Sequence, residues 1–143
     1  MRRTTDSDVR NFILRKMKTV FITGASGTMG AEALTQIART GKFLCRVLLR
    51  PKKANIRLAK KLQKNKLIEV IFGDIQNYDD CLTAVKGADY VLHCAAIIPP
   101  AADHNPDETF RTNRLGTENL LEAVAASGQI QKTKFVYIGT VAE

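Results

Sequence analysis

Short apolar runs alternate with amphipathic segments along most of this chain. Five runs have the length and the β-branched and aromatic content of strands, at 18–24, 43–50, 67–74, 88–96 and 134–139. Between them, apolar residues recur every three or four positions, which predicts helices at 28–39, 53–64, 78–85 and about 107–126. Glycine or proline follows most of these segments and marks their ends, and 97–106 is predicted to be a loop.

The regular alternation of strands and helices predicts a single α/β domain. Strands that are joined through helices form parallel sheets with right-handed crossovers, and the helices then cover both faces of the sheet. We therefore expect a doubly wound parallel sheet, the Rossmann fold, over residues 17–143, truncated after its fifth strand. Residues 1–16 precede the first strand and are expected to form a loosely ordered extension.

Composition limits the classes of protein to which the chain can belong. Apolar residues make up 45% of the sequence and charged residues 25%, which is ordinary globular composition. No apolar run is long enough for a transmembrane helix, and the charged start lacks the apolar middle of a signal peptide. The three cysteines, Cys45, Cys81 and Cys94, lack metal-ligand spacing and fit a reducing compartment. We expect a cytoplasmic protein with no metal site and no membrane partner.

The net charge of +8 is concentrated in one part of the chain. Residues 33–68 contain no acidic residue and hold half of the 22 lysines and arginines. Such a segment attracts nucleic acid or a phosphorylated ligand, or is simply the solvated face of a helix. No RNA-binding motif accompanies it, so nucleic acid is not an expected partner.

The stretch TGASGTMG at 23–30 follows the first strand and opens the first helix. Gly24 suits the tight turn, Gly27 the close approach of backbone to a pyrophosphate, and Gly30 the close packing of helix on strand. The N–H groups and the dipole at a helix start attract phosphate. This context favours dinucleotide binding over a purely structural turn. Further backbone or hydroxyl contacts are expected from Ser26, Thr28 and Met29.

The end of the second strand bears on which dinucleotide is bound. Proteins that prefer NAD place Asp or Glu about twenty residues after the last glycine, where it holds the ribose 2′-hydroxyl. Here that position is Arg50, and Lys52 and Lys53 stand nearby. A guanidinium clamps the 2′-phosphate that a carboxylate would repel. We therefore predict NADP as the cofactor, with NAD as the second choice. The alternative is that Arg50 merely solvates the strand end.

In combination these motifs resemble the extended short-chain dehydrogenase/reductase superfamily, in its NAD(P)-dependent epimerase/dehydratase-like branch. The resemblance covers about residues 17–143 and corresponds to the family's N-terminal portion. It rests on the glycine spacing at 24–30 and on four further stretches, GDI (73–75), HCAA (93–96), NRLGTENLLEA (113–123) and FVYIGT (135–140). It implies an oxidoreductase, epimerase or dehydratase acting on a nucleotide-sugar, a sterol-like alcohol or another small carbonyl compound. The oligomeric state stays open, with a homodimer as the candidate for the parent protein.

The resemblance also implies roles for individual residues. It places Asp74 and Ile75 beside the adenine and Ala95 and Ala96 along the cofactor. Thr140 takes the position of the hydroxyl that binds the reacting oxygen, and Asn113 that of an amide supporting the catalytic hydrogen-bond network.

The predicted helix at 107–126 leaves Asn113 with a second interpretation. Its sheet-facing side is expected to carry Phe110, Asn113, Thr117, Leu120, Leu121 and Val124. A buried amide without partners costs about 1–3 kcal/mol, so Asn113 could equally be a core amide bonded to backbone. His93, on a predicted buried strand, is expected to be a packed imidazole rather than a base.

The family's proton donor is a Tyr followed four residues later by Lys, roughly two dozen residues beyond the position of Thr140. The tyrosines here, Tyr78, Tyr90 and Tyr137, have Leu82, Cys94 and Val141 at that spacing, so none fits. We expect the chain to be the cofactor-binding part of a longer enzyme and to be inactive alone. The alternative is a complete NADP-binding sensor or scaffold module.

Overall fold

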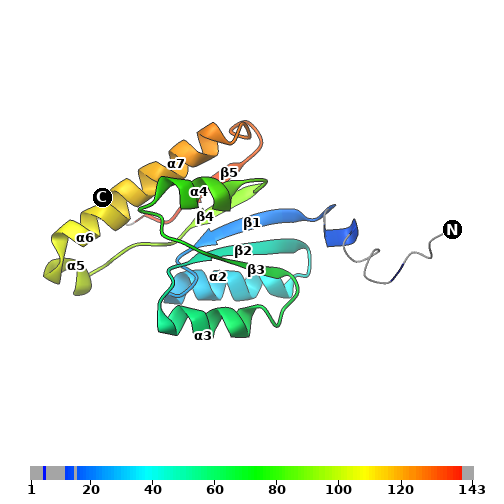
Figure 1. Ribbon diagram of the computed structural model, residues 1–143, viewed down its shortest axis with the longest axis horizontal. Coiled ribbons are helices and arrows are strands. Elements are labelled where there is room, and N and C mark those ends of the chain that lie inside the picture. The colour runs from blue at the N-terminus through cyan, green and yellow to red at the C-terminus, as the bar shows by residue number, and fades with distance from the viewer. Residues whose placement is uncertain (1–4, 6–11, 15, 140–143) are drawn as a thin grey trace.

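The structure, a computed structural model, describes residues 5, 12–14 and 16–139 of the chain (Figure 1). Five parallel strands form one sheet in the order β3-β2-β1-β4-β5. The strands are β1 (Lys18–Thr23), β2 (Phe43–Leu49), β3 (Ile68–Phe72), β4 (Tyr90–His93) and β5 (Lys134–Tyr137). Because the chain builds outward from β1 to β3 and then continues on the other side with β4, the predicted doubly wound sheet is confirmed.

Helices cover both faces of this sheet (Figure 1). On one face lie α2 (Thr28–Arg39) and α3 (Lys53–Leu62), and on the other α4 (Tyr78–Val85) packs against α7 (Gly116–Ala126). Between β4 and α7 come α5 (Ala101–His104), α6 (Pro106–Phe110) and the π-helix η1 (Arg111–Leu115). The predicted helix over 107–126 is therefore α6, η1 and α7 in succession, and the predicted loop at 97–106 contains α5. No described helix is long and apolar enough to cross a membrane.

Two apolar cores form because successive strand residues point to opposite faces of the sheet. Ile22 belongs to the core beneath α2 and α3, together with Val20, Leu34, Cys45, Val47, Leu49 and Ala59. Phe21 belongs to the core beneath α4 and α7, together with Leu48, Cys81, Val85, Val91 and Leu120. Burial on both faces explains why the strands appear in the sequence as nearly continuous apolar runs.

The prediction for the sheet-facing side of the long helix is wrong at two positions. Leu120 and Val124 are buried as expected, but Phe110 is 54% exposed and Leu121 48% exposed. The π-helix η1 carries an extra residue per turn, so Phe110, before η1, is out of phase with the buried residues of α7, whereas Leu121 lies within α7 beside its buried face. Within α7 the buried face instead includes Gly116 and Ala123.

Candidate functional site

A cavity of about 170 Å³ opens at the carboxyl ends of the first four strands. In open α/β sheets, ligands bind in the crevice where the strand order reverses, here between β1 and β4. The cavity is lined by Thr23, Gly24, Ser26, Gly27, Leu48, Leu49, Arg50, Asn55, Gly73, Asp74, Ile75, Cys94, Ala95, Ala96, Ile97 and Thr112.

Most residues that the sequence assigned to the cofactor come together in this cavity. Those that line it are Gly24, Ser26, Gly27, Arg50, Asp74, Ile75, Ala95 and Ala96. The remaining four, Thr28, Met29, Gly30 and Lys53, do not line it. Three of them form the first turn of α2, directly after the lining residue Gly27, and Lys53 is the exposed first residue of α3. Thr140 lies outside the described residues.

The three glycines after β1 have different structural reasons. Gly24 has φ +73°, and a Cβ there would lie 2.7 Å from the backbone of Cys94 and Ala95. A Cβ on Gly30 would lie 2.2 Å from the carbonyl oxygen of Gly24. Only glycine at position 30 therefore allows α2 to pack this closely against the turn after β1. At Gly27, in contrast, a Cβ would meet only the Gly24 oxygen at 3.4 Å, an ordinary contact. The turn and packing roles predicted for Gly24 and Gly30 are confirmed, whereas packing does not require glycine at 27.

The start of α2 suits an anion. Gly27 is the N-cap, no side chain caps the helix, and its first turn contains no acidic residue. The first intrahelical bond runs from the N–H of Ala31 to the oxygen of Gly27 over 2.9 Å. The helical N–H groups before Ala31 have no acceptor within the helix, and the helix dipole makes this end positive. A phosphate beside Gly27 would satisfy these donors.

A chain of hydrogen bonds runs from the cavity wall through the sheet to α7. The hydroxyl of Thr117 donates to the Asn113 carbonyl (2.6 Å), so its oxygen accepts from Nε2 of His93 (2.8 Å). Nδ1 of His93 then accepts from the hydroxyl of Thr23 (2.6 Å), whose oxygen accepts the N–H of Ala95 (3.2 Å). His93 is 1% exposed, and this burial lowers its pKa to about 4. The predicted packed imidazole is confirmed, and it is neutral at pH 7.

Asn113 holds the segment that follows β4. Its Oδ1 accepts the N–H of Ile97 (2.7 Å), and its Nδ2 donates to the carbonyl of Ile97 (2.8 Å). The predicted bonding of this amide to backbone is therefore confirmed. Because Ile97 lines the cavity, Asn113 also fixes part of the cavity wall. The residue lies in η1, and π-helical turns within helices are frequent at functional sites.

The turn after β3 is fixed by several contacts to α4 and α7. The N–H of Asp74 donates to Oδ2 of Asp80 (2.8 Å), and Oδ1 of Asp74 accepts the N–H of Gln76 (3.0 Å). The carbonyl of Ile75 accepts from Nδ2 of Asn119 (2.9 Å). A Cβ on Gly116 would lie 2.7 Å from the Ile75 side chain, so this glycine allows α7 to approach closely. Asp74 and Ile75 are thereby held at the cavity wall.

Two residues that the sequence did not single out contact Arg50, which directly follows β2. Nδ2 of Asn55, in the first turn of α3, donates to the carbonyl of Arg50 (2.8 Å) and lines the cavity. Nη1 of Arg50 lies 3.6 Å from Oε1 of Glu108 on α6. Asn55 could have been found from the sequence, because it is a polar residue that follows a strand end closely. Glu108 gave none, because it is 58 residues from Arg50 along the chain.

Glu108 has further partners at this edge of the cavity. Nε2 of Gln76 donates to its Oε1 (2.8 Å), and Nη2 of Arg111 donates to its Oε2 (3.3 Å). The hydrogen bond from Gln76 is the main cause that lowers the pKa of Glu108; burial opposes it as the next largest effect, and Arg111 and then Arg50 lower the pKa further. The carboxylate is therefore ionised at neutral pH.

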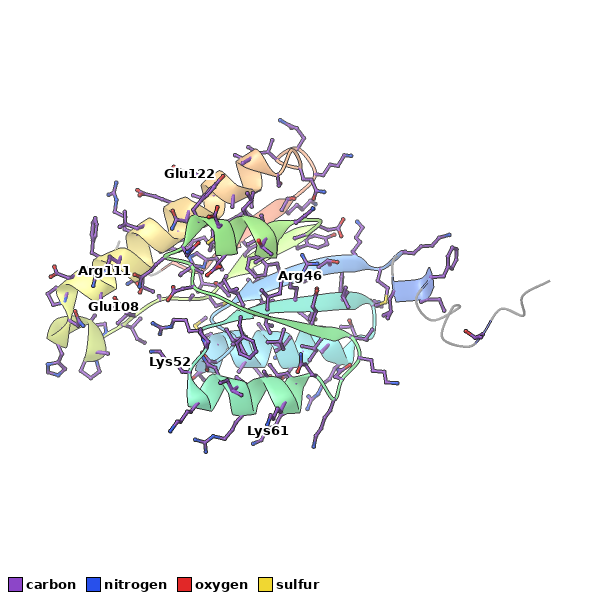
Figure 2. All side chains as sticks on the ribbon, viewed as in Figure 1. Arg46, Lys52, Lys61, Glu108, Arg111 and Glu122 are labelled. Atoms are coloured by element: carbon purple, nitrogen blue, oxygen red, sulfur yellow. The ribbon has the colours of Figure 1, made fainter. Side chains whose placement is uncertain are left out.

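The basic segment at 33–68 lies largely on the surface. Its α3 side chains Lys53, Arg57, Lys60 and Lys61 are exposed, and Lys52 and Lys61 extend from this part of the molecule in Figure 2. Of the basic residues in this segment, Arg50 alone lines the cavity. Among the described residues, no group of three His, Cys, Asp or Glu side chains could hold a metal ion.

Two curated proteins illustrate the relatives of this chain. An uncharacterized membrane protein of Methanocaldococcus jannaschii is 34% identical over 134 residues, which cover 93% of this chain and 38% of that protein. A UDP-glucose 4-epimerase of Rickettsia bellii is 34% identical over 113 residues, which cover 74% of this chain and 32% of that enzyme. The chain thus spans well under half the length of these relatives.

Solved structures also share the fold. The structure of Pen from Bacillus thuringiensis matches 85% of this chain with a TM-score of 0.74 and 33% identity, using 37% of its own length. A short-chain dehydrogenase/reductase superfamily protein from Agrobacterium tumefaciens, solved with bound NAD, matches 83% of this chain with a TM-score of 0.62 and 25% identity, using 31% of its own length.

A family match covers most of the chain. The family described as polysaccharide biosynthesis protein matches residues 20–141, which include most of β1, the strands β2 to β5 and the residues that line the cavity. The chain therefore belongs to this family, and its predicted membership of the NAD(P)-dependent epimerase/dehydratase-like branch of the extended short-chain dehydrogenase/reductase superfamily is confirmed.

Proposed function

We propose that the cavity binds a nicotinamide dinucleotide, NADP in preference to NAD, as the cofactor-binding part of an epimerase, dehydratase or reductase. The observation that carries this proposal is the uncapped start of α2, which opens beside a glycine that packing does not require. A diphosphate is the group that such a turn accepts most readily. The NAD-bound relative from Agrobacterium tumefaciens supports the same cofactor class.

The lining residues suggest how the dinucleotide would be held. The pyrophosphate would lie against Gly27, with Ser26, Thr28 and Met29 contributing backbone or hydroxyl groups. Asp74 and Ile75 would border the adenine, and Ala95 and Ala96 the path towards the nicotinamide. Arg50, with Lys53 nearby, would meet the 2′-phosphate, which is the basis for preferring NADP.

The bound dinucleotide would supply hydride-transfer chemistry. The proposed role of Asn113 is to hold the Ile97 segment, and with it the nearby cavity wall, in a fixed position. Thr140 is proposed to bind the reacting oxygen of the substrate. The UDP-glucose 4-epimerases among the relatives support a nucleotide-sugar or another small hydroxyl or carbonyl compound as this substrate.

Because the chain spans about a third of those epimerases, the activity of a whole protein is part of the proposal. We expect little or no turnover from these 143 residues alone. A homodimeric parent protein and a cytoplasmic location also stay predictions.

Calorimetric titration of the folded chain with NADPH and NADH tests the proposal. We expect both to bind and NADPH to bind more tightly. Tighter NADH would contradict the assignment of Arg50 to the 2′-phosphate. Absence of binding for both dinucleotides at millimolar concentration would contradict the proposed function itself.

A further inference from the structure

The end of β2 has an acidic neighbour that comes from a distant element. Helix α6 brings Glu108 to the rim of the cavity, and its Oε1 lies 3.6 Å from Nη1 of Arg50. Figure 2 shows Glu108 and Arg111 at the end of the molecule where α6 meets η1. Arg50 directly follows β2, at the position where a protein that prefers NAD would have a carboxylate. A carboxylate is nevertheless present at this place, supplied by α6.

Glu108 is anchored at this position by more than one contact. Nε2 of Gln76, in the turn after β3, donates both to Oε1 of Glu108 (2.8 Å) and to the hydroxyl of Thr112 (3.0 Å). Thr112 is 7% exposed and lines the cavity. Arg111 adds a bond to the other carboxylate oxygen, and the side chain of Glu108 is only 29% exposed. Glu108 does not line the cavity, but its contacts hold the carboxylate beside two residues that do, Arg50 and Thr112, which distinguishes it from an ordinary surface ion pair.

We propose that Glu108 sets the cofactor specificity of this site by occupying the guanidinium of Arg50, so that a 2′-phosphate binds less tightly than Arg50 alone would allow. The inference rests on the proposed dinucleotide function. A 2′-phosphate that approaches Arg50 must either displace Glu108 or share the guanidinium with it. When both anions contact the same guanidinium, the phosphate and the carboxylate repel each other. A 2′-hydroxyl meets no such repulsion and can donate a hydrogen bond to the carboxylate. Glu108 therefore reduces the difference in affinity by which the site prefers NADP over NAD.

The variant Glu108→Gln removes the charge and keeps the shape. Its amide oxygen can still accept from Gln76, so the local structure should be preserved. By calorimetry on the full chain, we expect NADPH to bind about fivefold more tightly than to the wild type, the size expected for one partly exposed charge interaction. The dissociation constant of NADH should stay within about twofold. The pair 2′,5′-ADP and 5′-AMP should show the same difference, which assigns it to the 2′-phosphate.

Glu118→Gln is the matched control. Glu118 forms an ion pair with Arg114 over 3.0 Å and does not line the cavity, so this variant loses the same charge at another place. It should leave the ratio of NADPH to NADH affinity unchanged. In an Arg50→Gln background, Glu108→Gln should have a smaller selective effect, because the competition for the guanidinium is gone and only the repulsion between the carboxylate and the 2′-phosphate remains.

Three outcomes would overturn the inference. An unchanged affinity ratio in Glu108→Gln would mean that the carboxylate does not act on the 2′-phosphate. An equal weakening of both dinucleotides would mean that Glu108 only supports the local fold. A shift of the same size in Glu118→Gln would mean that the total charge of the chain, and not the pair with Arg50, sets the preference. If the wild-type chain binds neither dinucleotide, the proposed function itself is refuted. The three outcomes above, in contrast, refute only the role of Glu108.

Discussion

At the scale of single residues, Gly27 is a position where an effect on ligand binding can be measured apart from an effect on folding. Its backbone is extended, with φ −92° and ψ 170°, a conformation that any residue adopts. Space exists for a methyl group, and the nearest atom would be an oxygen 3.4 Å away. The structure therefore gives no packing reason for glycine at this position. Contact with a ligand is the reason that we propose.

The variant Gly27→Ala should fold normally and bind poorly. We expect its free energy of unfolding to change by less than about 1 kcal/mol, because alanine fits the backbone conformation. Its dissociation constant for NADPH should rise about tenfold or more, since the methyl group would separate the phosphate from N–H donors whose bonds contribute about 1–3 kcal/mol. Chemical denaturation and calorimetric titration measure the two quantities.

Gly30→Ala provides the contrast. Its methyl group would lie 2.2 Å from the Gly24 oxygen, so the backbone must shift and the free energy of unfolding should fall by about 1–3 kcal/mol or more. Equal NADPH affinity in Gly27→Ala and wild type would show that the bound ligand does not approach this turn.

At the scale of elements, the sequence predicted what depends on local pattern. Strand runs and helix periods are local, and the order of the five strands and most helix bounds agree with the prediction. The glycine turn and Arg50 could be assigned for the same reason, since strand ends in a parallel sheet meet at one edge. Glu108 could not be assigned from the sequence, because its position beside Arg50 depends on the path that the backbone takes through residues 97–106. Phe110 was misplaced because sequence periodicity does not reveal a π-helix.

One element-level contact holds the end of α4 against the sheet. Arg46, on β2, donates from Nη1 to the carbonyls of Ala84 (2.9 Å) and Lys86 (2.7 Å) and from Nε to Glu69 (2.7 Å). Figure 2 labels this arginine. Its side chain is only 15% exposed. A cation at a helix C-terminus both satisfies the last carbonyls and complements the helix dipole.

The variant Arg46→Met should lower the free energy of unfolding by about 1–3 kcal/mol, because it leaves the partly buried carbonyl of Ala84 without this donor. NADPH affinity should be unchanged, since Arg46 does not line the cavity. Glu69→Gln should cost less than about 1 kcal/mol, because Glu69 is 45% exposed and its ion pair is solvated. Equal losses in both variants, measured by chemical denaturation, would show that the ion pair and not the helix end carries the effect.

At the scale of the whole molecule, the hydrogen-bond chain through His93 links elements far apart in the sequence. It joins Thr23 on β1, Ala95 after β4 and Thr117 on α7, and His93 lies at its centre. These contacts form only when the sheet and α7 are packed together. We therefore expect titration of His93 to be coupled to unfolding of the domain as a whole.

Acid should destabilise the molecule through this histidine. Its pKa is about 4 in the folded chain against an ordinary value of 6.5, so the unfolded chain takes up the proton first as pH falls. The full stability is present above pH 6.5, decreases between pH 6.5 and 4, and the loss levels off below pH 4 at about 3 kcal/mol. Carboxylates titrate near the lower limit as well, so the comparison must be made between variants.

The free energy of unfolding of His93→Gln should decrease less steeply over this pH range, whatever its stability at pH 7. Chemical denaturation at successive pH values measures this decrease. His104→Gln, which removes an exposed imidazole on α5, should keep the wild-type slope. A wild-type slope in His93→Gln would mean that the buried imidazole does not govern acid stability.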